Sequence, residues 1–303
     1  MKIAIIGAGA MGCLYACLLH PKQEVLLLDI SQPAVDAINR NGILKKEPDN
    51  TESVCRVPAA LSGTVHEPMD LVIVFVKDTA SRAALAGNRE LIGENTLLLS
   101  LQNGMGNEEV LEEFADRRQV LLGTTKHNCV TLSPGTILHS GSGMTHIGSP
   151  CGNMAAAGEI EQAFSRCGIQ AQACEDVKRL LWEKLFVNMT INPLTALLDA
   201  PISVLADSAD VQALAYTLLT EAVAVAKADG EEFDLETIYG SLIKTADTLR
   251  VGKASMCQDL EHGRKTEIDF INGAVVKLGI RYAIPTPAHE MIVRLIHAKE
   301  SLL

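Results

Sequence analysis

One ammonium and two amides recur every four residues in an otherwise apolar segment, LWEKLFVNMTINPLTALL, residues 181–198. They are Lys184, Asn188 and Asn192. Residues i, i+4 and i+8 share one face of a helix, so the spacing predicts a polar stripe on a mostly apolar helix. An ammonium can donate a proton where negative charge develops, and an amide can orient a substrate because it both donates and accepts. A lysine alone would more often be solvated. The two amides beside it favour a helix facing a polar cleft, with Pro193 as a kink or stop.

A second group of residues is suited to binding a dinucleotide. GAGAMG follows the apolar run KIAII directly and opens a predicted helix, which is the context that a G-x-G-x-x-G motif requires. Gly7 permits the tight turn, Gly9 lets the backbone approach a pyrophosphate, and Gly12 allows close helix–strand packing. The helix that starts around Ala10 and Met11 offers free N–H groups and a positive dipole end to phosphates. A glycine-rich turn without a ligand is the alternative.

Three further polar residues stand at the ends of predicted strands, where ligands bind in open α/β sheets. Asp29 lies roughly twenty residues beyond the glycines, where an acid hydrogen-bonds the adenosine ribose of NAD. Its carboxylate would repel a 2′-phosphate, so it favours NAD(H); a solvated strand-end acid is the alternative. Lys77 could lie over the cofactor phosphates. Asn103, in LQNGMGN, could reach the nicotinamide and substrate, although Asn-Gly pairs are equally ordinary in turns.

A third cluster lies near the C-terminal end, in SMCQDLEHGRKTEIDFINGAVVKLG, residues 255–279. Ser255 could cap the helix that follows it. Glu267 and Asn272 lie further along, where acids alternate with apolar residues. A solvated helix face would account for the same pattern.

The elements that must position these residues follow from hydrophobic periodicity. Short, nearly continuous apolar runs at 2–6, 24–29, 70–77 and 96–101 predict buried parallel strands. Predicted helices alternate with them near 10–20, 33–40, 79–88 and 106–115, which indicates a doubly wound sheet. Residues 120–149 favour antiparallel strands with a turn at 133–135, followed by a helix near 156–167 and a strand around 169–174.

Helical patterning continues from Val177 almost to the end, with breaks expected at Pro193, Pro201, Gly230, Gly252 and residues 284–287. The predicted fold is therefore α/β followed by all-α. We expect a Rossmann-type dinucleotide-binding domain at 1–175 and a helical substrate-binding domain at 176–303.

Composition excludes several kinds of partner. With 26 lysines and arginines against 37 aspartates and glutamates, the formal net charge is −11. That balance argues against a nucleic-acid or anionic-membrane surface. No run of apolar residues is long enough to span a bilayer, and the eight cysteines form no CxxC pair. We therefore expect a cytoplasmic protein with reduced thiols and no metal site.

Together, the glycine loop, LQNGMGN, WEKLFVNMTINPLTAL and SMCQDLEHGRKTEIDFINGAVV resemble the ketopantoate reductase family over nearly the whole chain. The resemblance implies reduction of 2-dehydropantoate (ketopantoate) to pantoate, as in pantothenate and coenzyme A biosynthesis. It also implies NADP(H) as the cofactor. The family often carries a basic residue at the end of the second strand, whereas Asp29 and Ile30 stand here, so NAD(H) remains open.

The resemblance implies a role for each matching residue. Lys184 corresponds to the general acid, and Asn188 and Asn192 to the asparagines that hold the substrate hydroxyl. Ser255 corresponds to the serine that contacts the substrate carboxylate, and Glu267 to the catalytic glutamate near the ribose and substrate. The remaining two are Asn103, between cofactor and substrate, and Lys77, near the adenosine end of the cofactor.

Two alternatives keep the same fold. The first is a reductase of a different 2-oxo or 3-oxo acid, which the sequence does not distinguish from ketopantoate reduction. The second is a non-catalytic dinucleotide sensor, which would have no need of the stripe beside Ser255 and Glu267. The expected partner is a small 2-oxo acid, with no nucleic acid and no membrane, and a homodimer stays open.

Overall fold

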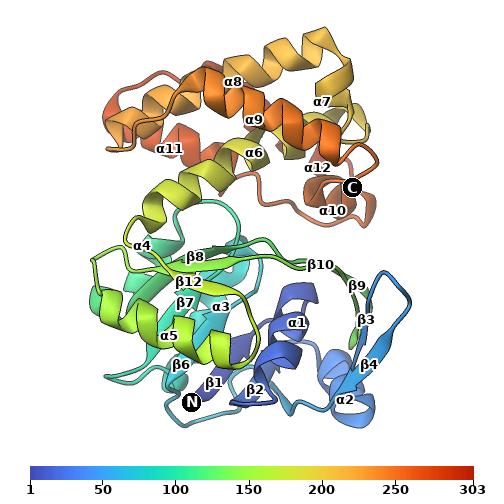
Figure 1. The fold of residues 1–303 in the computed structure, drawn as a ribbon, viewed down its shortest axis with the longest axis vertical. Coiled ribbons are helices and arrows are strands. Elements are labelled where there is room, and N and C mark those ends of the chain that lie inside the picture. The colour runs from blue at the N-terminus through green and yellow to red at the C-terminus, as the bar shows by residue number, and fades with distance from the viewer. The chain divides into compact units, whose positions relative to one another are not determined.

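Contacts divide the chain, whose 303 residues are all described by a computed structural model, into two units (Figure 1). The N-terminal unit comprises Met1–Gln102 and Asn107–Val177, and the helical unit comprises Asn103–Gly106 and Lys178–Leu303. The short segment Asn103–Gly106 thus belongs with residues far beyond it in the sequence.

The main sheet of the N-terminal unit has eight strands in the order β12-β11-β8-β7-β6-β1-β2-β5. All neighbours pair in parallel except β11, which runs antiparallel to β8. The strands are β1 (Lys2–Ile6), β2 (Glu24–Asp29), β5 (Ala59–Leu61), β6 (Leu71–Val74), β7 (Leu97–Ser100), β8 (Val120–Thr125), β11 (Thr145–Gly148) and β12 (Ala171–Ala173). This sheet confirms the predicted fold class of the N-terminal part.

Helices cover both faces of this sheet, which explains why its central strands, such as β1 and β6, are nearly continuous in apolar residues. On β1, Ile3 and Ile5 pack in one cluster with side chains of α1 and α5, while Ala4 and Ile6 pack in another with α3 and α4. The helices are α1 (Ala10–Leu19), α2 (Gln32–Asn41), α3 (Ser81–Gly87), α4 (Asn107–Glu112) and α5 (Met154–Arg166). Short 3-10 turns lie at Asp78–Ala80, Arg89–Leu91 and Arg117–Gln119.

The strand order reverses beside β1. The chain passes from β1 to β2 on one side and returns later to β6 on the other side. Ligands of open α/β sheets bind at the carboxyl ends of strands where the order reverses in this way. The glycine loop follows β1 and Lys77 follows β6, so both lie at this point of the sheet.

A smaller four-stranded sheet has the order β4-β3-β10-β9. Its strands are β3 (Ile43–Lys46), β4 (Glu52–Cys55), β9 (Asn128–Ser133) and β10 (Thr136–Gly141). The predicted turn at 133–135 is confirmed, with Gly135 at φ +73° between two antiparallel strands. Strand β8 pairs antiparallel with β11, as expected for 120–149, and its other edge pairs in parallel with β7, so that it extends the main sheet.

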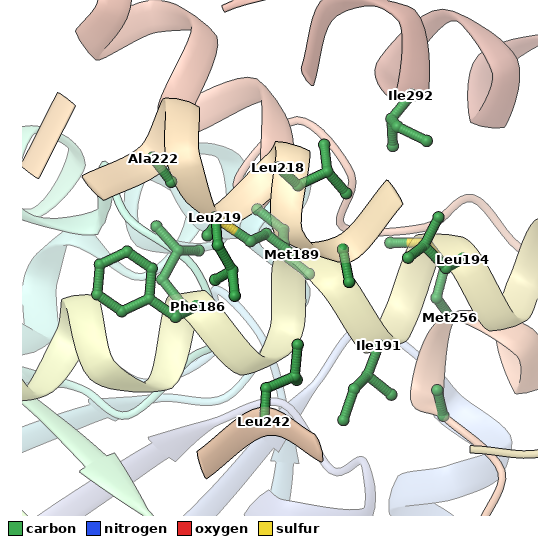
Figure 2. Close-up of a cluster of buried hydrophobic side chains, with 14 of the residues drawn as sticks. Phe186, Met189, Ile191, Leu194, Leu218, Leu219, Ala222, Leu242, Met256 and Ile292 are labelled. Carbon is green, nitrogen blue, oxygen red and sulfur yellow. The ribbon is translucent and has the colours of Figure 1, made fainter. Parts of the chain in front are cut away.

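The helical unit contains α6 (Val177–Leu198), α7 (Val204–Asp207), α8 (Ala209–Ala228), α9 (Leu235–Thr248), α10 (Ser255–Glu261), α11 (Asn272–Tyr282) and α12 (Pro287–Glu300). Figure 2 shows its core around α6, where Met189 lies among apolar side chains of α6 and α8. Asp229, just after α8, accepts hydrogen bonds from Trp182 Nε1 (3.0 Å) and Tyr282 Oη (2.6 Å). This carboxylate ties α6 and α11 to the end of α8.

Helix α8 is long and apolar enough by length and composition to span a membrane. Leu218 and Leu219 on it pack in the core of the helical unit. One side of α8, which also includes Ala222 and Val225, is buried in this core.

The expected break at Pro193 is wrong. Helix α6 continues through Pro193 to Leu198, with the proline in its interior. Proline removes one main-chain donor, and helices tolerate this where a neighbouring group hydrogen-bonds the carbonyl that is freed.

Candidate active site

The glycine loop has the geometry that a bound pyrophosphate requires. Gly7 has φ +109°, and a Cβ there would lie 2.9 Å from the backbone of Phe75. A Cβ on Gly12 would lie 1.8 Å from the carbonyl oxygen of Gly7. A Cβ on Gly9, by contrast, would meet no atom within 4 Å. The fold therefore requires the first and third glycines, and the middle one leaves the backbone accessible to a ligand.

Helix α1 presents backbone donors at the same place. Its N-cap is Gly9, and no side chain caps it. The first N–H groups of a helix have no intrahelical acceptor and bind anions readily, so those at Ala10 and Met11 suit a phosphate. The loop, the helix and the reversal of strand order together fit a dinucleotide.

Asp29 is tied to the glycine loop by its own side chain. Its Oδ2 accepts a hydrogen bond from the backbone N–H of Ala8 at 2.7 Å, and its Oδ1 accepts one from Ser31 N–H at 2.9 Å. The carboxylate is half-buried at the end of β2, and the next residue, Ile30, is 86% exposed. Asp29 therefore holds a negative charge in a fixed position beside the loop.

Lys77 is half-buried three residues beyond the end of β6, and it precedes a short 3-10 turn. Sequence reasoning missed the residue that supports this segment. Gln102 is buried after β7, and its Nε2 donates to the Val76 carbonyl (2.7 Å) and to Ser81 Oγ (2.7 Å). The amide of Gln102 thus fixes the backbone on one side of Lys77, and its only sequence signal is its place after a strand.

In the helical unit, Lys184, Asn188 and Asn192 all lie in the uninterrupted helix α6. Lys184 and Asn188 are half-buried, and Asn192 is buried. The predicted periodicity is therefore present in one element. The apolar residues between them, such as Phe186 and Met189, point into the core of the unit (Figure 2).

Asn103 and Glu267 come together, although 164 residues separate them. Asn103 Nδ2 donates to Glu267 Oε2 at 3.4 Å. Two backbone features hold the loop there: Met105 N–H donates to the Phe270 carbonyl at 2.9 Å, and Gly104 adopts φ +82°. A Cβ at Gly104 would lie 2.2 Å from that same carbonyl oxygen. The Asn-Gly pair is thus a turn that also positions the Asn103 side chain.

Ser255 differs from one expectation. It is the first residue of α10 and not its cap, because Ala254 occupies the N-cap position and no side chain caps the helix. The backbone of Ala254 is extended, whereas Ser255 is already helical, so its hydroxyl is not placed as a cap. Ser255 is exposed at the start of this short helix.

The candidate residues therefore form two groups. The N-terminal unit holds the glycine loop, Asp29 and Lys77, and the helical unit holds Asn103, Lys184, Asn188, Asn192, Ser255 and Glu267. The first group consists of backbone donors and fixed charges, and the second contains the groups that can donate or accept protons.

Comparison with known proteins covers both units. Residues 3–151 match the family model described as "Ketopantoate reductase PanE/ApbA", and residues 176–300 match "Ketopantoate reductase PanE/ApbA C terminal". The 2-dehydropantoate 2-reductase of Pyrococcus horikoshii is 32% identical over 303 residues, covering 100% of this chain and 98% of the relative. That of Streptococcus pyogenes serotype M6 is 32% identical over 306 residues, covering 100% and 99%.

Solved structures are also similar over the full length. A D-mandelate dehydrogenase in a ternary structure with NADH and anilino(oxo)acetate has a TM-score of 0.94 and 30% identity, covering 100% of this chain and 99% of that one. A putative 2-dehydropantoate 2-reductase from Enterococcus faecalis has a TM-score of 0.80 and 32% identity, with the same coverage.

Proposed function

The chain belongs to the ketopantoate reductase family and is an oxidoreductase, and from this premise we propose that it reduces 2-dehydropantoate to pantoate with a nicotinamide dinucleotide. The observation that carries the proposal is the Lys184–Asn188–Asn192 stripe on one helix, in the same unit as the Asn103–Glu267 pair. We further propose that residues 1–175 bind the dinucleotide and residues 176–303 bind the oxo acid. The oxidoreductase relatives argue against a non-catalytic dinucleotide sensor.

The residues of this chain would supply binding, orientation and one proton. When bound, the reduced dinucleotide supplies the hydride that reaches C2 of the oxo acid. Lys184 donates a proton from Nζ to the carbonyl oxygen, where negative charge develops, and is left as a neutral amine that regains its proton from water. Asn188 and Asn192 hydrogen-bond the substrate hydroxyl, and holding the ketone in position lowers the barrier by several kcal/mol.

The negative charge of the substrate would be balanced by the Lys184 ammonium together with a few neutral hydrogen-bond donors. Ser255 is exposed and its hydroxyl does not cap helix α10, so the hydroxyl can donate to the substrate carboxylate. Glu267, which accepts from Asn103, orients that amide toward the reacting groups. The net charge of −11 is compatible with such a site, since one ammonium and a few dipoles suffice for a single small anion.

Loss of the proton donor is the direct test. Lys184→Ala should lower kcat/KM with ketopantoate by ~10² or more, the usual scale for a positioned general acid. Lys244→Ala, an exposed lysine on α9, is the matched control and should leave kcat/KM unchanged. Both are measured by the absorbance of the reduced nicotinamide. A Lys184→Ala enzyme within threefold of wild type would rule out the proposed acid.

For the cofactor, we propose that NADH is usable alongside the NADPH that the family resemblance implies. The support is Asp29, whose charge is fixed beside the glycine loop by two backbone N–H groups. A 2′-phosphate beside a carboxylate is repelled, whereas ribose hydroxyls can donate to it. Steady-state KM values for NADH and NADPH test this, and a preference for NADPH above roughly a hundredfold would overturn it.

A second candidate substrate is another 2-oxo acid. The similarity to a D-mandelate dehydrogenase, at a TM-score of 0.94, favours including the oxo acid that corresponds to mandelate. Turnover with ketopantoate, this aryl oxo acid and simple aliphatic 2-oxo acids separates the two candidates. The ketopantoate proposal is overturned if the aryl acid has the higher kcat/KM.

We propose a cytoplasmic location, where both the dinucleotide and the oxo acid are available. The expected partners are these small molecules, and a homodimer through the helical unit stays a prediction.

A further inference from the structure

The carbonyl of Met189 lacks its usual helical partner. In an α-helix it would accept from the N–H of residue 193, and that residue is Pro193, which has none. Met189 is 0% exposed and lies in the apolar core around α6 (Figure 2). A buried carbonyl without a hydrogen bond costs about 1–3 kcal/mol, so another donor is required if α6 is to continue.

Asn272 supplies that donor. Its Nδ2 lies 3.0 Å from the Met189 carbonyl oxygen. Asn272 is the first residue of α11 and is 0% exposed. Its Oδ1 has no hydrogen-bond partner, so the burial of this side chain is offset by the bonds of its Nδ2 alone. The Asn272 side chain, at the start of α11, thus replaces the main-chain hydrogen bond that Pro193 removes from α6.

The second hydrogen of the same Nδ2 reaches His289 on α12, whose Nδ1 lies 3.2 Å away. A carbonyl can only accept, so the Met189 oxygen fixes which end of the amide faces it. His289 Nδ1 must then be the acceptor, and its Nε2–H donates to the Leu218 carbonyl at 3.0 Å. Burial lowers the pKa of His289 to about 4, which keeps the ring neutral in this tautomer.

We propose that Asn272 is a positioning residue for the Lys184–Asn188–Asn192 stripe, because its amide replaces the hydrogen bond that Pro193 removes from the middle of the stripe. Met189 follows Asn188, and Pro193 follows Asn192. The helical turn that lacks the main-chain hydrogen bond between residues 193 and 189 is therefore the turn next to both amides. With the Met189 carbonyl held, that turn has one conformation. The effect on catalysis rests on the proposed function, whereas the hydrogen bond itself does not.

Two substitutions test the replacement as a pair. Asn272→Leu keeps the volume and removes the donors, and Pro193→Ala restores an N–H that can donate to the Met189 carbonyl. We expect Asn272→Leu to lower kcat at least tenfold, with the KM for the dinucleotide within twofold of wild type, since the loss of orientation affects the chemical step. Adding Pro193→Ala should return kcat to within threefold of that of Pro193→Ala alone.

Amide hydrogen exchange of residues 186–198, measured by mass spectrometry, tests the hydrogen bond between Asn272 and the Met189 carbonyl independently of activity. Exchange should accelerate at least tenfold in Asn272→Leu and slow again in the double variant. Asn88→Ala is the matched control. Asn88 is also buried, and its Nδ2 donates to a helix carbonyl, that of Ala84, at 2.8 Å. Pro193→Ala should not rescue any loss caused by Asn88→Ala.

The outcomes separate the two proposals. Asn272→Leu with unchanged kcat, or a double variant as impaired as Asn272→Leu in both measurements, overturns the positioning role. Rescue of exchange without rescue of kcat overturns it as well. Failure of the proposed function appears differently, as an unaffected Lys184→Ala enzyme. If Asn272→Leu does not fold, Asn272→Ala, which removes the same donors without adding bulk, is measured in its place with the same expectations.

Discussion

At the scale of residues, the dinucleotide site depends on one carboxylate that has two tasks. Asp29 binds the glycine loop through the N–H of Ala8, and under the proposed function its charge would face the adenosine ribose. Its second oxygen accepts from Ser31, so the side chain cannot swing away without breaking a main-chain contact. If Asp29 discriminates between dinucleotides as proposed, the same residue also anchors the loop.

Removing the charge should alter cofactor preference. We expect Asp29→Ser to lower the ratio of kcat/KM for NADH over NADPH by about tenfold, because the repulsion of a 2′-phosphate is lost. The control is Asp36→Ser, since Asp36 is an exposed acid on α2 that accepts from Gln32. Equal ratios in wild type and Asp29→Ser would show that another residue discriminates.

At the scale of elements, the central strands β1, β2, β6 and β7 could be predicted because they are largely buried and their sequences are apolar runs. The short, half-buried strand β5 was not predicted. Strands β3 and β4 could not be predicted either, because LKKEPDNTES is polar and half-exposed. They are ordered by pairing with each other and, through β3, with β10 far along the chain. The error at Pro193 has the same origin. The group that lets α6 continue, Asn272, is 79 residues away and carries no local signal.

The contact between α1 and β1 gives a prediction about the three glycines. Gly12→Ala should lower the stability of the protein by about 1–3 kcal/mol, because the new Cβ would overlap the Gly7 carbonyl at 1.8 Å. Gly9→Ala meets no protein atom and should fold with wild-type stability, but its methyl group occupies the space that a pyrophosphate approaches. Thermal unfolding and a dinucleotide titration measure the two effects. Weakened binding without destabilisation is expected for Gly9→Ala only.

The packing of α8, α11 and α12 around His289 makes the helical unit sensitive to acid. The pKa of His289 is held at about 4 by burial, below its unfolded value of about 6.5. As the pH falls through this interval the unfolded chain binds a proton that the folded chain does not, so stability falls; above pH 6.5 it is fully present. Between about pH 7 and about pH 5 the loss should be about 2 kcal/mol.

Denaturation at the two pH values, followed by Trp182 fluorescence, measures that loss. His289→Asn should reduce the difference in unfolding free energy between the two pH values. His66→Gln, which removes a histidine whose side chain is 63% exposed, should leave it as in wild type. A His289→Asn protein that keeps the full acid sensitivity would assign it to another group.

At the scale of the whole molecule, local sequence patterns did not predict that Asn103–Gly106 belongs with the helical unit. The resemblance placed Asn103 between cofactor and substrate, and the structure adds its hydrogen bond to Glu267. That pairing depends on a turn whose geometry is set by Phe270, and no local pattern encodes it. Local sequence likewise does not define the partners of Ser255 and Lys77.

The single tryptophan allows the two units to be followed separately. Trp182 is 0% exposed in the helical unit, so its emission reports the unfolding of that unit. A dinucleotide bound to the N-terminal unit at about 100 times its Kd should stabilise that unit by about 2.7 kcal/mol. Circular dichroism reports the unfolding of both units, whereas Trp182 fluorescence reports only the helical unit. We expect the dinucleotide to raise the unfolding temperature seen by circular dichroism and to leave that seen by fluorescence unchanged. Equal shifts in both signals would indicate that the dinucleotide stabilises the whole chain.

The placement of Asn103–Gly106 has a consequence for building chimaeras within this family. In this chain the segment 103–106 contacts the Phe270 carbonyl, through the Met105 N–H and the close approach of Gly104. Exchanging the C-terminal halves of two relatives at about residue 176 would pair this segment with the C-terminal half of another protein. A graft that carries the recipient's residues 103–106 against the donor's residues 267–270 would combine two surfaces that were not selected together. Recombination should therefore succeed more often when this four-residue insert travels with the C-terminal half.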